Sequence, residues 1–331
     1  MRMVLGIDGG ASKTHALLLG EDGAVLGFGK GGCANHQSCG LAEAEAEIEK
    51  AVQEALNGRT APIDLACYCL AGADFPSDYT MLQNAMEKNP AARRIVVKND
   101  TMAAMRAGLS RPWGVVVICG SGFNSAARTP EGKEIVMPGL RAMSGDWGGG
   151  YALAEEMIRL IMRAWDTRGA PTLLTEAVLD HFDLRSVEEL LYRLYHDKID
   201  HQQVMSMVPL LFETAEKGDQ VAIDLVKRMG VETGVTARSL IRRGGMEALN
   251  PEVVLGGSVY KGQGSLLIDT VKAEIHTHYP GVMVKQPKYE PVVGAALLAL
   301  EALGITIGQA AIEKMESTLP KGLFIGDSIS I

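Results

Sequence analysis

The chain has 331 residues, of which 47% are apolar and 22% charged, and its formal net charge is -8. This length and composition are typical of a globular protein with two domains, and the acidic balance argues against nucleic acid as a partner. No apolar run approaches the ~18 residues of a membrane span, and the odd cysteine count, five, argues against a disulfide framework and favours a cytoplasmic protein. The first expected strand begins at Met3, which leaves no room for a signal peptide.

In the first half of the chain, three strand patterns precede an alternation of helix and strand patterns. Gly9-Gly10 and Glu21-Asp22-Gly23 separate the first three strands and are typical of hairpin turns. In chain order, we expect strands at Met3–Asp8, His15–Gly20 and Ala24–Phe28, a helix at Leu41–Leu56, a strand at Asp64–Leu70, a helix at Asp78–Lys88, a strand at Arg94–Val97 and a helix at Thr101–Leu109.

The second half of the chain repeats this order. We expect strands at Gly114–Cys119, Asn124–Arg128 and Lys133–Met137, helices from Tyr151–Ala164 through Asp219–Arg243, a strand at Glu252–Leu255, a helix at Ser265–His276, a strand at Val282–Lys285 and a helix at Val292–Leu303. A repeat in element order predicts two similar α/β domains with a cleft between them. The alternative is one doubly wound sheet, but two three-strand meanders are unusual for such a sheet.

The domain boundary is expected near Ser110–Trp113. The N-terminal domain then covers residues 1–112, and the C-terminal domain covers residues 113–303 with a helical insertion at 150–245. The last residues, 304–331, lack a strong periodic pattern toward their end and are expected as a tail that packs on the N-terminal domain.

The turn after the first strand is the first candidate for a phosphate site. Its glycines permit close approach of the backbone to a ligand, and its hydroxyl and ammonium groups can contact phosphate oxygens. The residues expected to bind phosphate are Gly9, Gly10, Ser12, Lys13 and Thr14. Asp8, at the strand end, is expected to hold Mg2+ through water. Taken alone, the motif is also compatible with an ordinary glycine-rich hairpin.

The matching turn of the second meander contains Gly120, Ser121 and Gly122. Two such turns at equivalent places predict a clamp for nucleotide phosphates. Gly256, Gly257 and Ser258 end a late strand and could let adenosine lie against the backbone, although a strand-to-helix turn capped by the serine explains them equally well.

Three other positions could carry the chemistry. Asp100 follows a strand and starts a helix, so it is either a helix cap or the general base that deprotonates an attacking hydroxyl. Asp146 precedes a long helix and could bind a substrate hydroxyl or Mg2+, or it could only cap that helix. Asn35 and His36 could donate hydrogen bonds to a polar substrate or form only a loop.

Other patterns are weaker. Gly27-x-Gly29-x-x-Gly32 has the spacing of a dinucleotide fingerprint, but it does not open directly onto a helix. Cys33 and Cys39 lack a second pair at zinc spacing.

The ordered set of motifs resembles the nucleotide-binding signature of the actin, hexokinase and heat-shock-protein ATPase superfamily. It consists of two phosphate loops at Asp8–Thr14 and Val116–Ser125, connecting segments at Asp100–Gly108 and Val293–Leu300, and an adenosine loop at Val254–Tyr260. The resemblance spans nearly the whole chain. It implies an α/β fold of two actin-like (ribonuclease H-like) domains with a nucleotide and sugar cleft between them.

Within that superfamily the chain resembles the BadF/BadG/BcrA/BcrD ATPase family, in particular its eukaryotic-type N-acetylglucosamine kinase branch. The motifs that carry this are Ala34-Asn35-His36, Asn99-Asp100, Gly120–Asn124, Gly145–Gly148 and Gly256–Ser258. The resemblance implies that Asp100 is the base for a sugar hydroxyl. It also implies that Asn35, His36, Gly72, Asn124 and Asp146 hold the sugar.

The chain departs from this family at two places. Trp147 stands where the family often has Glu, and Ala11-Ser12 stands where the kinases often have Gly-Thr. Ser12 keeps a hydroxyl for phosphate, whereas Trp147 leaves the identity of the sugar open. Activators of radical enzymes, which belong to the same family, carry a cysteine-containing loop for an iron–sulfur cluster, and no such loop follows Gly139.

The sequence therefore predicts ATP-dependent phosphorylation of a monosaccharide, such as N-acetylglucosamine or glucosamine, with ATP and Mg2+ as cofactors. The expected partner is this small sugar, and a homodimer is compatible with the sequence. The alternatives are an ATPase coupled to a partner protein and a non-enzymatic, nucleotide-dependent switch.

Overall fold

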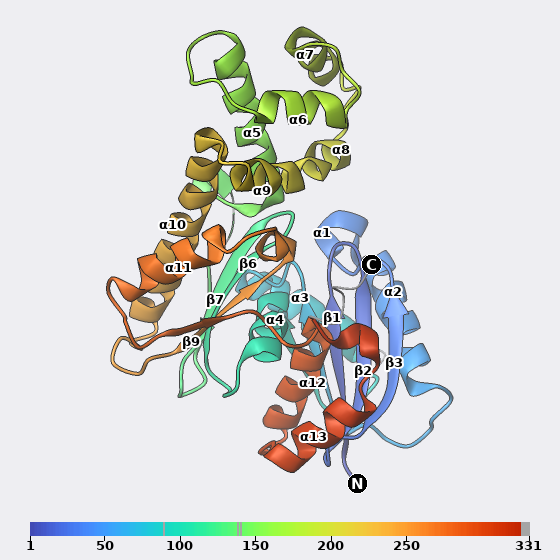
Figure 1. Ribbon diagram of the computed structural model, residues 1–331. Helices are drawn as coiled ribbons and strands as arrows, with labels where there is room; N and C mark the ends of the chain where they lie inside the picture. Colours follow the sequence, from blue (N-terminus) through green and yellow to red (C-terminus); the bar gives the residue numbers. More distant parts are fainter. Residues whose placement is uncertain (89, 138, 140, 326–331) are drawn as a thin grey trace. The chain divides into compact units, whose positions relative to one another are not determined.

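The structure is a computed structural model that describes residues 1–88, 90–137, 139 and 141–325. The chain divides into two compact units (Figure 1). Unit 1 contains Met1–Val116, Ala126–Val136 and Lys285–Ile331, and unit 2 contains Val117–Ser125 and Met137–Val284. This division differs from the expected boundaries because part of the second meander and the last long helix group with unit 1. None of the described helices is long and apolar enough to span a membrane.

The first sheet has five strands in the order β3-β2-β1-β4-β5. Its strands are β1 (Met3–Gly9), β2 (Thr14–Gly20), β3 (Val25–Gly31), β4 (Leu65–Leu70) and β5 (Ile95–Asn99). β2 is antiparallel to its neighbours β1 and β3, whereas β4 and β5 run parallel to β1. Every residue of β1 and β4 is buried, as expected for central strands that read as continuous apolar runs.

The second sheet also has five strands, and its order is β10-β9-β6-β7-β8. Its strands are β6 (Gly114–Cys119), β7 (Phe123–Arg128), β8 (Glu134–Met137), β9 (Glu252–Gly256) and β10 (Met283–Lys285). Starting from β8, the order is β8-β7-β6-β9-β10, which matches β3-β2-β1-β4-β5 in the first sheet strand for strand. In both sheets a three-strand meander is followed by two further strands. The predicted repeat of element order is therefore confirmed.

The helices of unit 1 cover its sheet. They are α1 (His36–Cys39), α2 (Leu41–Leu56), α3 (Pro76–Lys88), α4 (Asp100–Gly108), α12 (Pro291–Ala302) and α13 (Gln309–Thr318). The α2 helix buries Ala44, Ile48, Ala51, Val52 and Ala55 along one face, at helical spacing. Its backbone lies directly on β3, because a Cβ on Gly27 would come within 1.9 Å of the Ala55 carbonyl oxygen. The glycine pattern of β3 therefore serves helix packing.

The C-terminal segment packs on the β2–β3 hairpin of unit 1 (Figure 1). Lys314 of α13 pairs with Asp22 in the hairpin turn, and the Val25 amide donates to the Thr318 hydroxyl at 3.0 Å. This helix was not expected from the sequence, where its residues fall in the tail. The α12 helix packs against α4 so closely that a Cβ on Gly294 would lie 2.0 Å from the Ala103 carbonyl oxygen.

Unit 2 contains the long helical insertion between β8 and β9. Its helices are α5 (Gly149–Trp165), α6 (Leu174–His181), α7 (Val187–Tyr195), α8 (His201–Ser206), α9 (Val208–Glu216) and α10 (Gln220–Arg243), and α11 (Leu266–His276) follows β9. The core of unit 2 includes Leu153 and Met157 of α5, both fully buried.

Candidate active site

The first candidate phosphate turn joins β1 to β2. It is closed by a hydrogen bond of 2.9 Å from the Gly10 amide to the Lys13 carbonyl. Ser12 and Lys13 are exposed, and the Lys13 ammonium lies 2.8 Å from the Glu290 carboxylate. Thr14 is buried, and its hydroxyl donates to the Gly32 carbonyl at 2.7 Å. The turn therefore offers one free hydroxyl, one ammonium and exposed backbone, while the Thr14 side chain is engaged within the protein.

The Asp8 carboxyl lies at the base of this turn and is only 8% exposed. Burial raises its pKa to about 7, and the negative charges of Asp100 and Glu290 act in the same direction. Lys13 opposes this shift. A second positive charge near Asp8 would stabilise its ionised form, so this group fits a hydrated Mg2+ bound through water. Among the described residues, no group of three or more acidic, histidine or cysteine side chains could hold a metal directly.

The carboxyl ends of β1, β4 and β5 meet at one edge of the first sheet. The parallel register places Gly9 beside Leu70 and Leu70 beside Asn99, so the residues that follow each strand gather there. Asp100 starts α4 at this edge. Burial raises the pKa of the Asp100 carboxyl to about 6, with a further contribution from Asp74.

Asn99 fixes the geometry at the start of α4. Its side-chain oxygen accepts hydrogen bonds from the amide and the hydroxyl of Thr101, and its side-chain amide donates to Asp74 at 3.0 Å and to the Ala73 carbonyl at 3.1 Å. The helix cap is therefore Asn99. Asp100 is therefore not the helix cap. Backbone hydrogen bonds from Thr101 and from its own amide lower the pKa of its carboxyl group, but burial outweighs them and leaves this pKa at about 6, which suits a general base.

Asn35, His36 and Gly72 lie together in unit 1. Asn35 caps α1 by accepting from the Gln37 amide at 2.9 Å. A Cβ on Gly72 would meet the Asn35 side-chain oxygen at 3.1 Å and the His36 ring at 2.8 Å. The buried Nδ1 atom of His36 has no hydrogen-bond partner among the described residues. A buried polar atom without a partner is unfavourable, and a ligand hydroxyl would satisfy it.

The second candidate phosphate turn lies in unit 2 and packs on the start of α5. The Gly150 amide donates to the Gly120 carbonyl at 2.7 Å, and the Tyr151 amide donates to the Ser121 carbonyl at 3.1 Å. Ser121 and Gly122 are exposed at the tip of the turn. The helix thereby fixes the carbonyl groups of the turn and leaves the Ser121 hydroxyl on the surface.

The candidate adenosine turn contacts this second phosphate turn. Gly257 has a φ of 103°, and a Cβ there would lie 2.3 Å from the Cys119 carbonyl oxygen. A cavity of about 340 Å³ lies beside both turns. Its walls include Gly120, Gly150, Val208, Phe212, Ser258 and Gly262. The lining combines apolar side chains and glycine backbone with polar side chains that include Glu213, Lys261 and Gln263, and such a mixture suits a flat heterocycle with polar edges.

Asn124 and Asp146 both face Gly139 in unit 2. A Cβ on Gly139 would lie 3.1 Å from the Asn124 side-chain oxygen and 3.6 Å from the Asp146 carboxylate. The next residue, Trp147, is partly buried, and the Arg228 guanidinium stacks 3.9 Å from the centre of its ring. The structure therefore brings Asn124 and Asp146, the two predicted sugar ligands of unit 2, close to the same glycine. The Trp147 ring, which stacks on Arg228, follows Asp146 directly in the sequence.

Two side chains of this site were missed in the sequence. Asp74 follows β4 and contacts Asn99, and Glu290 precedes α12 and pairs with Lys13. Asp74 could have been found because it follows a strand that is parallel to, and adjacent to, the strands carrying Asp8 and Asp100. Glu290 lies 277 residues from Lys13 in the chain, and no local pattern predicts that pairing.

The family model of the BadF/BadG/BcrA/BcrD ATPases matches residues 5–299. The chain belongs to this family. Among proteins of assigned function, it is similar to an N-acetylmuramic acid/N-acetylglucosamine kinase of Clostridium acetobutylicum, with 27% identity over 90% of this chain and 98% of that one. It is also similar to an N-acetyl-D-glucosamine kinase of Dictyostelium discoideum, with 26% identity over the same shares.

Two solved structures have the same fold. A putative N-acetylglucosamine kinase from Chromobacterium violaceum aligns with a TM-score of 0.67 at 21% identity, over 90% of this chain and 99% of that one. A glucokinase of the ROK family from Streptomyces griseus, in complex with glucose and AMPPNP, aligns with a TM-score of 0.57 at 20% identity, over the same shares. The fold is thus the actin-like two-domain α/β fold with two mixed five-stranded sheets, as predicted.

Proposed function

We propose that this ATPase-family protein transfers the γ-phosphoryl group of ATP to a hydroxyl of a monosaccharide, and that the acceptor is an amino sugar such as N-acetylglucosamine or glucosamine. The observation that carries this proposal is the Asp100 carboxyl, which is buried at the edge of the first sheet where Asp8 also lies, is not the cap of α4 and has a pKa raised to about 6. The two kinase relatives, each aligned over 90% of this chain, support the choice of acceptor class.

Asp100 is assigned as the general base. A carboxylate with a pKa near 6 is ionised at neutral pH and can accept the proton of an attacking hydroxyl as the new bond to phosphorus forms. The Asn99 cap holds the first turn of α4 in place, so Asp100 keeps one orientation. In phosphoryl transfer, positioning and electrostatic stabilisation supply most of the rate acceleration.

The nucleotide contacts are assigned to both turns. Gly9, Gly10, Ser12 and Lys13 in unit 1, and Gly120, Ser121 and Gly122 in unit 2, are assigned to the phosphates, whereas the Thr14 hydroxyl is engaged by the Gly32 carbonyl and is left out of this set. Gly256, Gly257 and Ser258 are assigned to adenosine because Ser258 of this turn lines the cavity of unit 2. Asp8 would hold Mg2+ through water, and the bound ion would neutralise charge on the phosphates.

The sugar contacts are assigned to Asn35, His36 and Gly72 in unit 1 and to Asn124 and Asp146 in unit 2. The unpartnered Nδ1 atom of His36 is the strongest support for a polar ligand in unit 1. Trp147 adds an aromatic face next to Asp146, and its ring is held by Arg228.

ADP release from the purified protein tests this proposal. With ATP and Mg2+, we expect ADP to form only when an accepted sugar is added, and the product sugar to gain one phosphate by mass spectrometry. The panel should contain glucosamine, N-acetylglucosamine, glucose and N-acetylmuramic acid. ADP release that is the same with and without every sugar would contradict the kinase assignment and favour an ATPase coupled to another protein.

The Asp100→Asn variant tests the base. Loss of a general base typically lowers kcat by about 10²–10⁴-fold. A matched control is Asp269→Asn, which removes an aspartate from the first turn of α11 in unit 2. If Asp100→Asn retained sugar phosphorylation at the control's rate, Asp100 would not be the base.

A further inference from the structure

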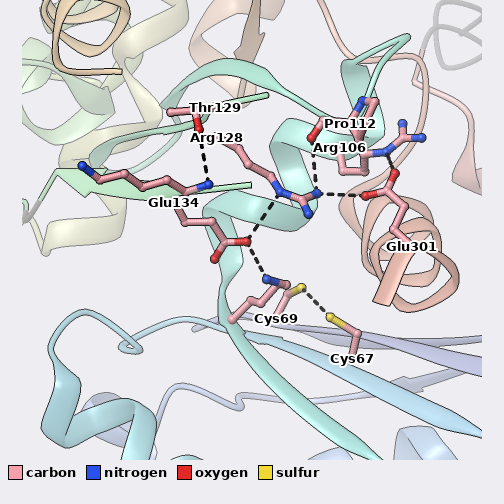
Figure 2. Close-up of polar contacts among 10 residues, drawn as sticks. Cys67, Cys69, Arg106, Pro112, Arg128, Thr129, Glu134 and Glu301 are labelled. Atoms are coloured by element: carbon pink, nitrogen blue, oxygen red, sulfur yellow. Dashed lines mark hydrogen bonds and ion pairs between the residues drawn. The ribbon is translucent and has the colours of Figure 1, made fainter. Parts of the chain in front are cut away.

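Five charged side chains of unit 1 form one continuous chain of ion pairs (Figure 2). Glu134 on β8 lies 2.5 Å from the Lys98 ammonium and 3.9 Å from Arg128 on β7. Glu301 on α12 lies 2.9 Å from Arg128 and 2.6 Å from Arg106 on α4. Along this row of ion pairs, which we call the strip, the residues follow in the order Lys98, Glu134, Arg128, Glu301 and Arg106.

The strip is largely shielded from solvent. Its side chains are between 8% exposed, at Arg106, and 24% exposed, at Glu134. Arg106 also donates to the Leu109 carbonyl at 3.0 Å, and Arg128 donates to the Pro112 carbonyl at 3.2 Å. A shielded ion pair is unfavourable unless its geometry and hydrogen bonds are nearly complete, so each member depends on its neighbours for its position.

Both ends of the strip hold the segment that carries Asp100. Lys98 lies two residues before Asp100 on β5, and Arg106 lies six residues after it on α4. No loop separates the strand from the helix, because β5 ends at Asn99 and α4 begins at Asp100. A shift of either element would therefore move the Asp100 carboxylate.

The middle of the strip comes from parts of the chain remote from Asp100. Arg128 and Glu134 belong to the β7–β8 hairpin of the second sheet, and Glu301 belongs to the last long helix of the chain. Arg128 lies between the two glutamates and contacts both, and each glutamate pairs with one cation of the Asp100 segment. Through these ion pairs, strand β5 and helix α4 are both attached to the β7–β8 hairpin and to α12. This attachment is separate from the hydrogen bonds of the Asn99 cap.

We infer that Glu134 and Glu301 are positioning residues for Asp100, acting through Lys98 and Arg106. This inference rests on the proposed function, in which Asp100 must meet an attacking hydroxyl. Glu134 pairs with Lys98, and Glu301 pairs with Arg106 and Arg128, so we expect both glutamates to act on the rate of phosphoryl transfer through the placement of Asp100 and to leave the binding of sugar and ATP unchanged. A misplacement of about 1 Å lowers the rate of an oriented reaction by up to about 100-fold.

The test compares Glu134→Gln with a matched variant in unit 2. Glu274 on α11 pairs with Arg238 on α10, and the side chains of this pair are 24% and 16% exposed, as are those of Glu134 and Lys98. Both variants remove one carboxylate charge from an equally shielded pair. We expect similar losses of melting temperature. We expect kcat to fall about tenfold or more in Glu134→Gln, with both KM values within about twofold, and to stay within about twofold of wild type in Glu274→Gln.

Equal effects of the two variants on kcat would overturn the inference, as would a loss in Glu134→Gln that appears only in KM. If Glu134→Gln does not fold, Lys98→Met and Lys98→Arg replace it. Lys98→Met should lower kcat in the same way, and Lys98→Arg, which keeps the cation, should restore most of it. A kcat in Lys98→Met that equals the kcat of Lys98→Arg would contradict the role.

A readout without activity separates this inference from the proposed function. Hydrogen–deuterium exchange of the first turn of α4, from Thr101 to Ala103, should become faster in Glu134→Gln and stay unchanged in Glu274→Gln. If the wild-type protein forms no sugar phosphate but this exchange difference is seen, the kinase proposal fails while the support of the Asp100 segment stands. Unchanged exchange in Glu134→Gln would overturn the inference even in an active kinase.

Discussion

Asp8 and His15 lie directly opposite each other where β1 pairs with β2, and burial acts on them in opposite directions. Burial raises the pKa of the Asp8 carboxyl to about 7, whereas burial and the nearby Lys13 charge lower the pKa of the His15 imidazole to about 4. His15 is therefore neutral at physiological pH and gives Asp8 no compensating charge. The ionised form of Asp8 is unfavourable in the free protein, and this makes it a suitable place to receive a cation.

Asp8→Asn should stabilise the free protein at alkaline pH. Between about pH 4 and pH 7 the folded state holds a proton on Asp8 that the unfolded state has released, so the free energy of unfolding falls as pH rises. The Asp8→Asn variant has no titrating group at this position, so its free energy of unfolding does not fall for this reason. We expect its free energy of unfolding to exceed that of wild type by about 1–4 kcal/mol at about pH 8 and by little at about pH 4, measured by urea denaturation.

The same substitution should weaken catalysis, because Asp8 is the proposed site for Mg2+. Asp269→Asn, outside the site, is the control for the change of charge, and its stability should follow wild type across the pH range. An Asp8→Asn protein that is less stable than wild type at alkaline pH would show that the buried carboxylate is favourable, which would contradict the raised pKa.

The rate of phosphoryl transfer should fall on the acidic side of neutrality. Burial raises the pKa of Asp100 to about 6, and protonation below that value removes the base. The negative charge of Asp100 also raises the pKa of Asp8, so Asp8 titrates in the same range of pH. We expect a profile of kcat against pH with an acidic limb between about pH 6 and pH 7. A flat profile down to about pH 4.5 would contradict the assignment of a buried carboxylate as the base.

The sequence predicted the first domain's elements well because their signals are local. The apolar runs and glycine turns gave the strands of the first sheet to within a few residues, and the apolar spacing of Leu41–Leu56 gave α2 at its observed ends. The repeat of element order in the two halves followed from the two meanders, whereas the positions of the later strands in each sheet were not predicted. The α13 helix was missed because its residues are largely polar and form a helix that docks against the β2–β3 hairpin, a contact between the two ends of the chain.

The site was predicted in part. Its glycine turns and Asp100 stand out because they follow strands, and the edge of a parallel sheet gathers such residues. Two hydrogen-bonding details could not be predicted from the sequence, because they depend on how the side chains are oriented in the folded protein. The Thr14 hydroxyl is used internally by Gly32, and the cap of α4 is Asn99 rather than Asp100. The ion pairs of Glu290 and Glu301 join segments that are 277 and 195 residues apart, and no spacing rule predicts such pairs.

Gly294→Ala should destabilise the protein although alanine favours helices. The new Cβ would lie 2.0 Å from the Ala103 carbonyl oxygen and 2.6 Å from the Ala107 amide nitrogen, so α12 and α4 would have to separate. We expect a loss of about 2–4 kcal/mol in the free energy of unfolding. Gly322→Ala, where no atom of the described residues lies within 4 Å of the new Cβ, is the control and should be close to neutral. A Gly294→Ala protein as stable as that control would contradict the close packing of the two helices.

Gly72→Ala should weaken sugar binding without a matching effect on ATP. Gly72 has a φ of 83°, and the new Cβ would meet the His36 ring at 2.8 Å and the Asn35 side-chain oxygen at 3.1 Å. Both proposed sugar ligands would have to move. We expect the KM of the sugar to rise about tenfold and the KM of ATP to stay within about twofold, measured by initial rates of ADP release.

Gly58→Ala separates this clash from backbone strain. Gly58 has a φ of 75°, and no atom lies within 4 Å of its new Cβ, so alanine there meets the same left-handed penalty of about 1–2 kcal/mol without displacing a neighbour. Both variants should therefore lose stability through strain, Gly72→Ala should lose at least as much as Gly58→Ala, and only Gly72→Ala should raise the KM of the sugar. If both variants changed that KM equally, strain or partial unfolding would explain the effect. Asn35 and His36 would then have no special part in holding the sugar.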